Sequence, residues 1–193
     1  MNSEKSSETL LMYVNDMLAL ERLIKDAING QRKDDDVLSD SATSALLEKI
    51  ATSTDTRLKA LKELSETLGG GAGVIKETVA AVAGVFAGLY DMVRKHPVSR
   101  MLRDDYTALS LASTAYSMLY TTAVALHSDR VAAVARHGLQ TVVPLVLQVS
   151  HLIPAVVVGE LAKDHPDANH VAIAAGREAL EKAWSPDGSP VHG

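Results

Sequence analysis

Two carboxylates stand at positions where apolar side chains are expected. Glu21 and Asp105 each interrupt a stripe of apolar residues that recur three and four positions apart. Such a stripe is the buried face of an amphipathic helix. A carboxylate there either binds a divalent metal ion or accepts hydrogen bonds, because burying it unpaired is costly. We therefore expect both carboxylates to be buried, with a metal ion, Arg57, Arg103, a tyrosine or a histidine as partner.

Most other site chemistries lack their residues in this sequence. The 193-residue chain has no cysteine, which excludes thiol catalysis, disulfides and iron–sulfur clusters. It contains no Gly-x-Ser-x-Gly motif for a nucleophilic serine. The glycine-rich segment 69–76 lacks the Gly-Lys-Ser/Thr ending of a phosphate-binding loop and is interpreted as a helix stop. These absences favour a protein that is not an enzyme.

Charge and composition exclude two further classes. The net charge is −5, and the lysines and arginines are scattered, whereas nucleic-acid binding needs a basic stripe. Residues 1–7 are polar and are expected to be flexible. Because the N-terminus carries no apolar signal segment, the sequence predicts a cytoplasmic protein.

The elements that must position the two carboxylates are helices. No sustained alternation of apolar and polar residues marks a strand. Helical spacing predicts helices at about 7–28, 40–68, 74–95, 99–127, 130–163 and 171–184. The fifth is expected to continue through two prolines, Pro144 and Pro154, since its apolar pattern does not stop there. Together they predict an all-α domain over residues 8–184, followed by a disordered tail, 185–193.

Two helical segments carry no charged residue. Residues 106–128 and 137–159 contain no Asp, Glu, Lys or Arg, and each is 23 residues long. A helix of that length can cross a membrane. However, polar residues and two prolines interrupt the segments and no basic residues frame them, so a membrane span is not predicted. We expect instead a hairpin buried nearly all round.

Burial of that hairpin requires a cover. The helix at 74–95, a second subunit, or both would provide it, because monomers rarely expose large apolar patches. Since one helix covers only one side, the sequence predicts a homodimer. The contact is expected to share residues with the core: Ala112, Leu119, Val142 and Val149.

Two local motifs carry a family resemblance. The segments YVNDMLALE (13–21) and LRDDYTAL (102–109) resemble an uncharacterised bacterial branch of the ferritin-like four-helix bundles. The resemblance covers residues 8–163 and implies two antiparallel helical hairpins joined by a long crossover containing the 74–95 helix. It also implies metal ligands in the first helix of each hairpin, at Glu21 and Asp105. The branch has no assigned activity.

The ligand set that this resemblance implies is incomplete. A di-iron bundle takes a Glu from two helices and Glu-x-x-His from the other two. If the first turn is centred near residue 35, Glu48 faces Glu21, and Ala51 stands where the histidine should be. In the second hairpin His151 is expected opposite Asp105, with Gln148 replacing the glutamate. We therefore expect no bound metal.

Three functions remain open on the sequence alone. The first is a non-catalytic bundle that acts through self-association or a protein partner, with a stress-related role implied by the resemblance. The second is an iron-handling or redox protein with a reduced iron or manganese site. Its ligands would come from five residues: Glu21, Glu48, Asp105, Gln148 and His151. The third is a module that holds an apolar ligand between the second hairpin and the 74–95 helix.

Overall fold

The computed structural model describes residues 2–70 and 97–185, and in these ranges the chain forms helices and no strand. The all-α prediction is therefore confirmed. The helices are α1 (Asn2–Gln31), α2 (Asp35–Ser39), α3 (Ser41–Thr67), α5 (Val98–Ala125), α6 (Asp129–Asp164) and α7 (Val171–Trp184). The predicted helix at 74–95 and the tail from residue 186 lie outside the described residues.

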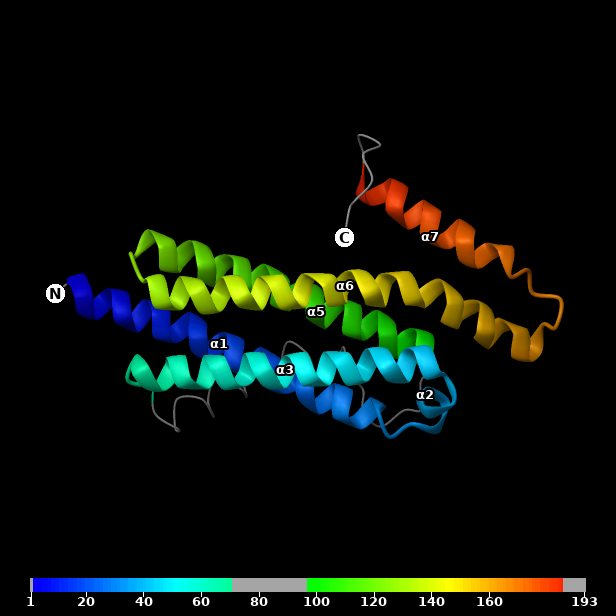
Figure 1. Cartoon of the computed structure of the whole chain (residues 1–193), viewed down its shortest axis with the longest axis horizontal. Helices are drawn as coiled ribbons and strands as arrows, with labels where there is room; N and C mark the ends of the chain where they lie inside the picture. The colour runs from blue at the N-terminus through cyan, green and yellow to red at the C-terminus, as the bar shows by residue number, and fades with distance from the viewer. Residues whose placement is uncertain (1, 71–96, 186–193) are drawn as a thin grey trace.

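The four long helices lie side by side (Figure 1). Helix α1 packs against α3 and α5, and α6 packs against α5 and α3. Helices that pack against each other run in opposite directions, so α3 and α5 run in the same direction and begin at the same end of the bundle. The end of α3 and the start of α5 therefore lie at opposite ends of the bundle.

Local capping sets where α3 begins and ends. The Asp40 side chain accepts a hydrogen bond of 2.8 Å from the backbone N–H of Thr43, as expected of an N-cap aspartate. At the other end Gly69 has a φ of 86°, a left-handed conformation that glycine adopts without strain. The glycine-rich segment acts as a helix stop, as the sequence predicted.

The first hairpin differs from the prediction at its turn. Helix α1 begins at Asn2, within the segment expected to be flexible, and continues to Gln31 rather than ending near residue 28. The expected loop contains the five-residue helix α2, capped by Asp34 and anchored by the buried side chain of Val37. By contrast, α6 continues through both Pro144 and Pro154, as predicted.

The predicted inner stripes form the core. All the apolar stripe residues of α5 from Leu102 to Ala123 are buried, and so are the matching residues of α1 and α3. Ala112, Leu119, Val142 and Val149 are fully buried, so the expectation that they share a subunit contact was wrong. The core alone accounts for their apolar character.

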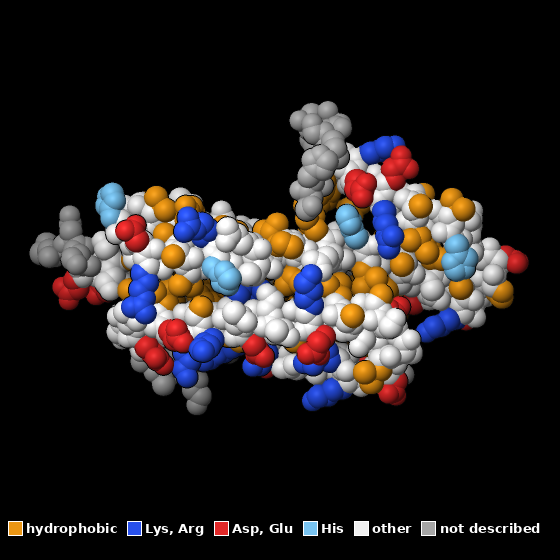
Figure 2. Space-filling model, in the orientation of Figure 1, with side chains coloured by type: hydrophobic (Ala, Val, Ile, Leu, Met, Phe, Trp, Pro, Cys, Tyr) orange, Lys and Arg blue, Asp and Glu red, His pale blue; other side chains and the backbone are white. Residues whose placement is uncertain are grey.

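The outer faces of α5 and α6 are not enclosed. Leu111, Met118 and Val124 on α5 are exposed, and so is Val143 on α6. Charged side chains gather over α3, whereas the middle of α6 is hydrophobic and uncharged (Figure 2). Among the described helices, only α6 is long and apolar enough to cross a membrane, and 39% of its most apolar stretch is buried. The described residues of the chain therefore do not enclose the hairpin by themselves, and its cover by the 74–95 helix or a second subunit stays a prediction.

Candidate functional site

Glu21 lies at the centre of a buried polar cluster contributed by three helices. Arg57 on α3 donates from Nε to Glu21 Oε1 at 2.6 Å and from Nη2 to Oε2 at 3.0 Å. The Tyr116 hydroxyl on α5 donates to Oε1 at 2.9 Å. All three side chains are fully buried. We call Glu21, Arg57 and Tyr116 the buried triad.

The triad engages both oxygens of the Glu21 carboxylate. Arg57 also donates from Nη1 to Ser53 Oγ at 2.7 Å and from Nη2 to Thr54 Oγ1 at 3.0 Å. A two-pronged contact between a guanidinium and a carboxylate is among the strongest side-chain hydrogen bonds. Because the Arg57 cation already pairs with both oxygens of Glu21, a second cation such as a metal ion at this carboxylate is disfavoured.

Burial and the neighbouring charges also fix the protonation of Tyr116 and Arg57. Burial is the main cause that raises the pKa of Tyr116 well above its usual value, and the Glu21 charge adds to it. For Arg57, burial lowers the pKa, but the charge and hydrogen bonds of Glu21 outweigh burial and leave it raised. Tyr116 thus stays a neutral donor and Arg57 a cation at neutral pH, so neither serves as a general base.

Helix α6, the fourth long helix, packs against the Tyr116 ring of the triad at Gly138. A Cβ atom added to Gly138 on α6 would lie 2.3 Å from Tyr116 Cε1. Only a residue without a side chain lets α6 approach the tyrosine ring this closely. The absence of a side chain at residue 138 therefore helps to hold the Tyr116 hydroxyl against Glu21.

Asp105 belongs to a separate polar layer. It is buried and accepts a hydrogen bond of 2.9 Å from Gln31 Nε2 at the end of α1. Arg103, one of the donors expected for it, binds Asp104 instead, at 2.8 Å from Nε to Oδ1. The reason is that the Arg103 side chain points outward and is 66% exposed, beyond the reach of the core.

Distances along the helices separate the two carboxylates. Tyr116, which meets Glu21, is 11 residues from Asp105 on α5. At 1.5 Å per residue the two layers are about 16 Å apart. A third layer lies towards the other end, where Ser65 donates to Asn15 Oδ1 at 3.0 Å. The core thus holds three polar layers at different heights.

The remaining candidate ligands lie outside the core. Glu48 is exposed and pairs with Arg32. Gln148 accepts a hydrogen bond of 2.7 Å from Lys49 Nζ. The His151 side chain faces α7 instead of Asp105, with Nε2 3.9 Å from Glu181 Oε1. The structure therefore does not bring the five candidate ligands together.

These positions do not fit a di-iron site. In residues 2–70 and 97–185 no group of three histidine, aspartate or glutamate side chains is placed to hold a metal ion. Glu21 and Asp105 are in different layers, and the other three candidates are on the surface. The sequence did not reveal the donors to Asp105 and Asn15, because Gln31 follows the predicted end of the first helix near residue 28 and Ser65 is not part of an apolar stripe.

The comparisons with known proteins give no family. No protein-family model matches the chain. Searches against curated proteins and against solved structures found no significant match.

Purified protein is expected to contain no stoichiometric iron, manganese or zinc, because its acids and histidines do not converge. Elemental analysis of protein made without a histidine tag measures this directly. About one metal ion per chain, lost on Glu48→Gln or His151→Ala, would contradict the expectation. Both residues are on the surface, so these variants test ligation without disturbing the core.

Proposed function

We propose that this protein is a non-catalytic, ferritin-like helical bundle that acts by associating with a second copy of itself. Two hairpins with α3 and α5 running in the same direction support the ferritin-like part, because that arrangement needs a long crossover. The buried triad supports the non-catalytic part, since its polar atoms are engaged with each other. An iron-handling role would need several ligands close together, and the described residues contain no such group.

The observation that carries the proposal is the outer face of α5. Five exposed, uncharged residues recur there three and four positions apart: Leu111, Thr114, Met118, Thr121 and Ala125. We call them the outer α5 face. A surface helix normally carries charged residues on the side away from the core. Here none occurs on any side of the helix over residues 106–128.

A second copy of the same chain suits this face. Its spacing is that of the contact stripe between paired helices, where side chains of one helix fit between those of the other. Two copies related by a twofold axis would bring two such stripes together without opposing like charges. Symmetric dimers are the commonest closed assemblies of soluble proteins. An uncharged face would otherwise leave apolar surface in water.

A charge placed in the outer α5 face tests the proposal. We expect Met118→Glu to weaken dimerisation at least tenfold, because two added carboxylates would be desolvated close together in the contact. Light scattering across a micromolar concentration series measures the change. Met12→Glu is the matched control, since Met12 on α1 is 53% exposed and Met118 is 50% exposed.

The outcomes separate the alternatives. Loss of dimer in Met118→Glu alone, with unchanged helix content by circular dichroism, supports the outer α5 face. If both variants stay dimeric, another face is used and the choice of α5 is wrong. If the wild-type chain is monomeric and sediments with lipid vesicles, the outer α5 face binds membranes and the proposal of self-association is wrong.

A further inference from the structure

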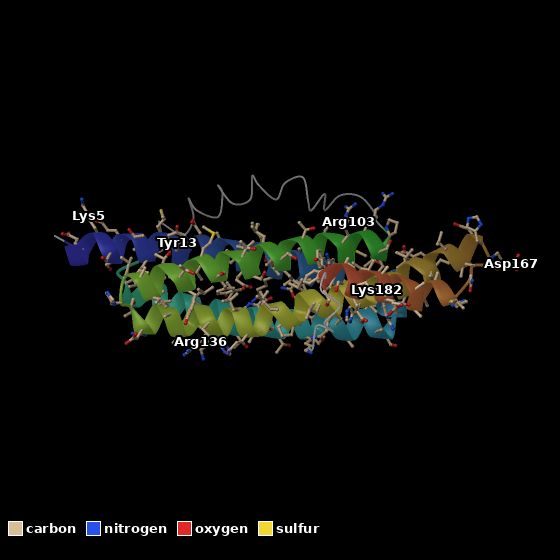
Figure 3. All side chains as sticks on the ribbon, turned by 90° about the horizontal axis from the view of Figure 1, so that it is seen from above. Lys5, Tyr13, Arg103, Arg136, Asp167 and Lys182 are labelled. Atoms are coloured by element: carbon tan, nitrogen blue, oxygen red, sulfur yellow. The ribbon has the colours of Figure 1, made fainter. Side chains whose placement is uncertain are left out.

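Helix α7 lies outside the four-helix bundle (Figure 1) and packs against α6, over which it is seen in Figure 3, where Lys182 is labelled. None of its residues is fully buried, and only Ile173, Gly176 and Leu180 on one face are partly buried. Gly176 lies closest to α6: an added Cβ would be 3.3 Å from Pro154 Cβ. One turn of α7 beyond this contact, the two helices are far enough apart to leave a cleft.

The cleft between α6 and α7 has a volume of about 270 Å³. Its walls combine apolar side chains with polar ones: Pro144, Leu147, Gln148, Ser150, His151, Leu180, Glu181 and Trp184. Small-molecule sites have this mixture, and their volumes begin near about 300 Å³. A ligand of the cleft is therefore small and has an apolar body.

Most polar side chains of the cleft already have partners. Gln148 donates to the Pro144 carbonyl and accepts from Lys49, and Ser150 Oγ donates to the Leu147 carbonyl. Glu181 differs, because its side chain is 61% exposed. Its Oε1 atom lies 3.9 Å from His151 Nε2, which is beyond hydrogen-bond length. Its carboxylate is available to a ligand.

The charge of the cleft selects the class of ligand. Glu181 is the only acid among the described lining residues, and no lysine or arginine is among them. Arg177 lies one turn away, with its Nε donating to the His151 carbonyl at 2.9 Å. Trp184, at the end of the cleft, offers the aromatic face that binds cations best.

We propose that the α6–α7 cleft binds a small organic ammonium ion with an apolar body. The ammonium group pairs with Glu181 and lies over the indole of Trp184, while the apolar body packs against Leu147, Leu180 and Pro144. This site is separate from the outer α5 face and does not depend on self-association. The third function left open by the sequence also involves an apolar ligand, but at a different place, between the second hairpin and the 74–95 helix.

Trp184 provides the measurement. It is the only tryptophan in the chain, so fluorescence excited where tyrosine does not absorb reports on this cleft alone. The probes are phenethylamine, phenethyl alcohol and phenylacetate, which share a ring and differ in charge. We expect saturable binding of the amine on the order of tenfold tighter than the alcohol, from the ion pair and the cation–aromatic contact. The anion should bind weakest.

Two variants assign the preference to Glu181. Glu181→Gln is expected to lose the part of the amine preference that the ion pair supplies and to keep only the part from the Trp184 contact, while Glu178→Gln keeps the whole preference. Glu178 is a matched control because it is an exposed acid on the same helix that pairs with Lys182 and does not line the cleft. No saturable signal with any probe, tightest binding of phenylacetate, or an amine preference that is undiminished in Glu181→Gln would overturn the proposal.

Discussion

Arg57→Met is expected to lower the free energy of unfolding by about 3–5 kcal/mol. The substitution keeps the apolar stem of the side chain but leaves the Glu21 carboxylate buried with Tyr116 as its remaining partner. Breaking a buried ion pair from one side is costly, because the surviving charge has lost its partner and is shielded from water. Urea unfolding at pH 7, extrapolated to zero denaturant, measures the loss.

The same structure predicts how the loss can be reversed. Glu21→Leu alone should also be costly, because it strands the Arg57 guanidinium in the core. The triple variant Glu21→Leu, Arg57→Met, Tyr116→Phe removes all the triad's polar groups and should return to within about 1–2 kcal/mol of wild type. Arg57→Met costing less than about 1 kcal/mol would show that Arg57 and Glu21 are not a buried pair.

Gly138→Ala is expected to destabilise the protein by about 1–3 kcal/mol. Its Cβ would lie 2.3 Å from the Tyr116 ring, so either α6 moves away or the ring turns and its hydroxyl leaves Glu21. In thermal unfolding each kcal/mol corresponds to about 2–4 °C for a chain of this size. The melting temperature should therefore fall by several degrees.

Gly159→Ala is the matched control on the same helix. An added Cβ there meets no atom within 4 Å. Because alanine restricts the unfolded chain more than glycine does, this variant should gain about 0.4–1 kcal/mol. The two variants are thus expected to move the melting temperature in opposite directions. Equal shifts would mean that α6 does not approach Tyr116 as described.

Local periodicity predicted the burial of the two carboxylates. Glu21 and Asp105 each replace one member of an otherwise apolar stripe, and the stripe alone places them in the core. Arg57 and a tyrosine were among the expected donors, and both bind Glu21. The bounds of the second hairpin were also predicted closely, since the expected helices at 99–127 and 130–163 correspond to α5 and α6.

The pairing within the first hairpin could not be read from periodicity. Helix α2 is five residues long, too short to show a helical repeat, and it moves the turn along the chain. Glu21 consequently meets Arg57, and the midpoint between these two residues is residue 39. The expected pairing of Glu21 with Glu48 had assumed that the turn is centred near residue 35. The sequence also did not show that α1 continues to Gln31. The hydrogen bond from Gln31 to Asp105 was therefore not predicted.

Absence of charge predicted that α5 and α6 need a cover beyond their own bundle. Helix periodicity does not say which residues of each helix lie under that cover. The structure buries one side of each helix and leaves residues such as Met118 and Val143 exposed. The exposed set, rather than the buried one, defines the face through which we propose that the protein acts.

The mass of the native chain in solution tests that central proposal most directly. Multi-angle light scattering of the untagged, full-length protein at micromolar concentration should give twice the chain mass of 20.5 kDa. The dimer should persist in high salt, because the outer α5 face carries no charge to be screened. A mass of one chain across the whole concentration series would contradict self-association.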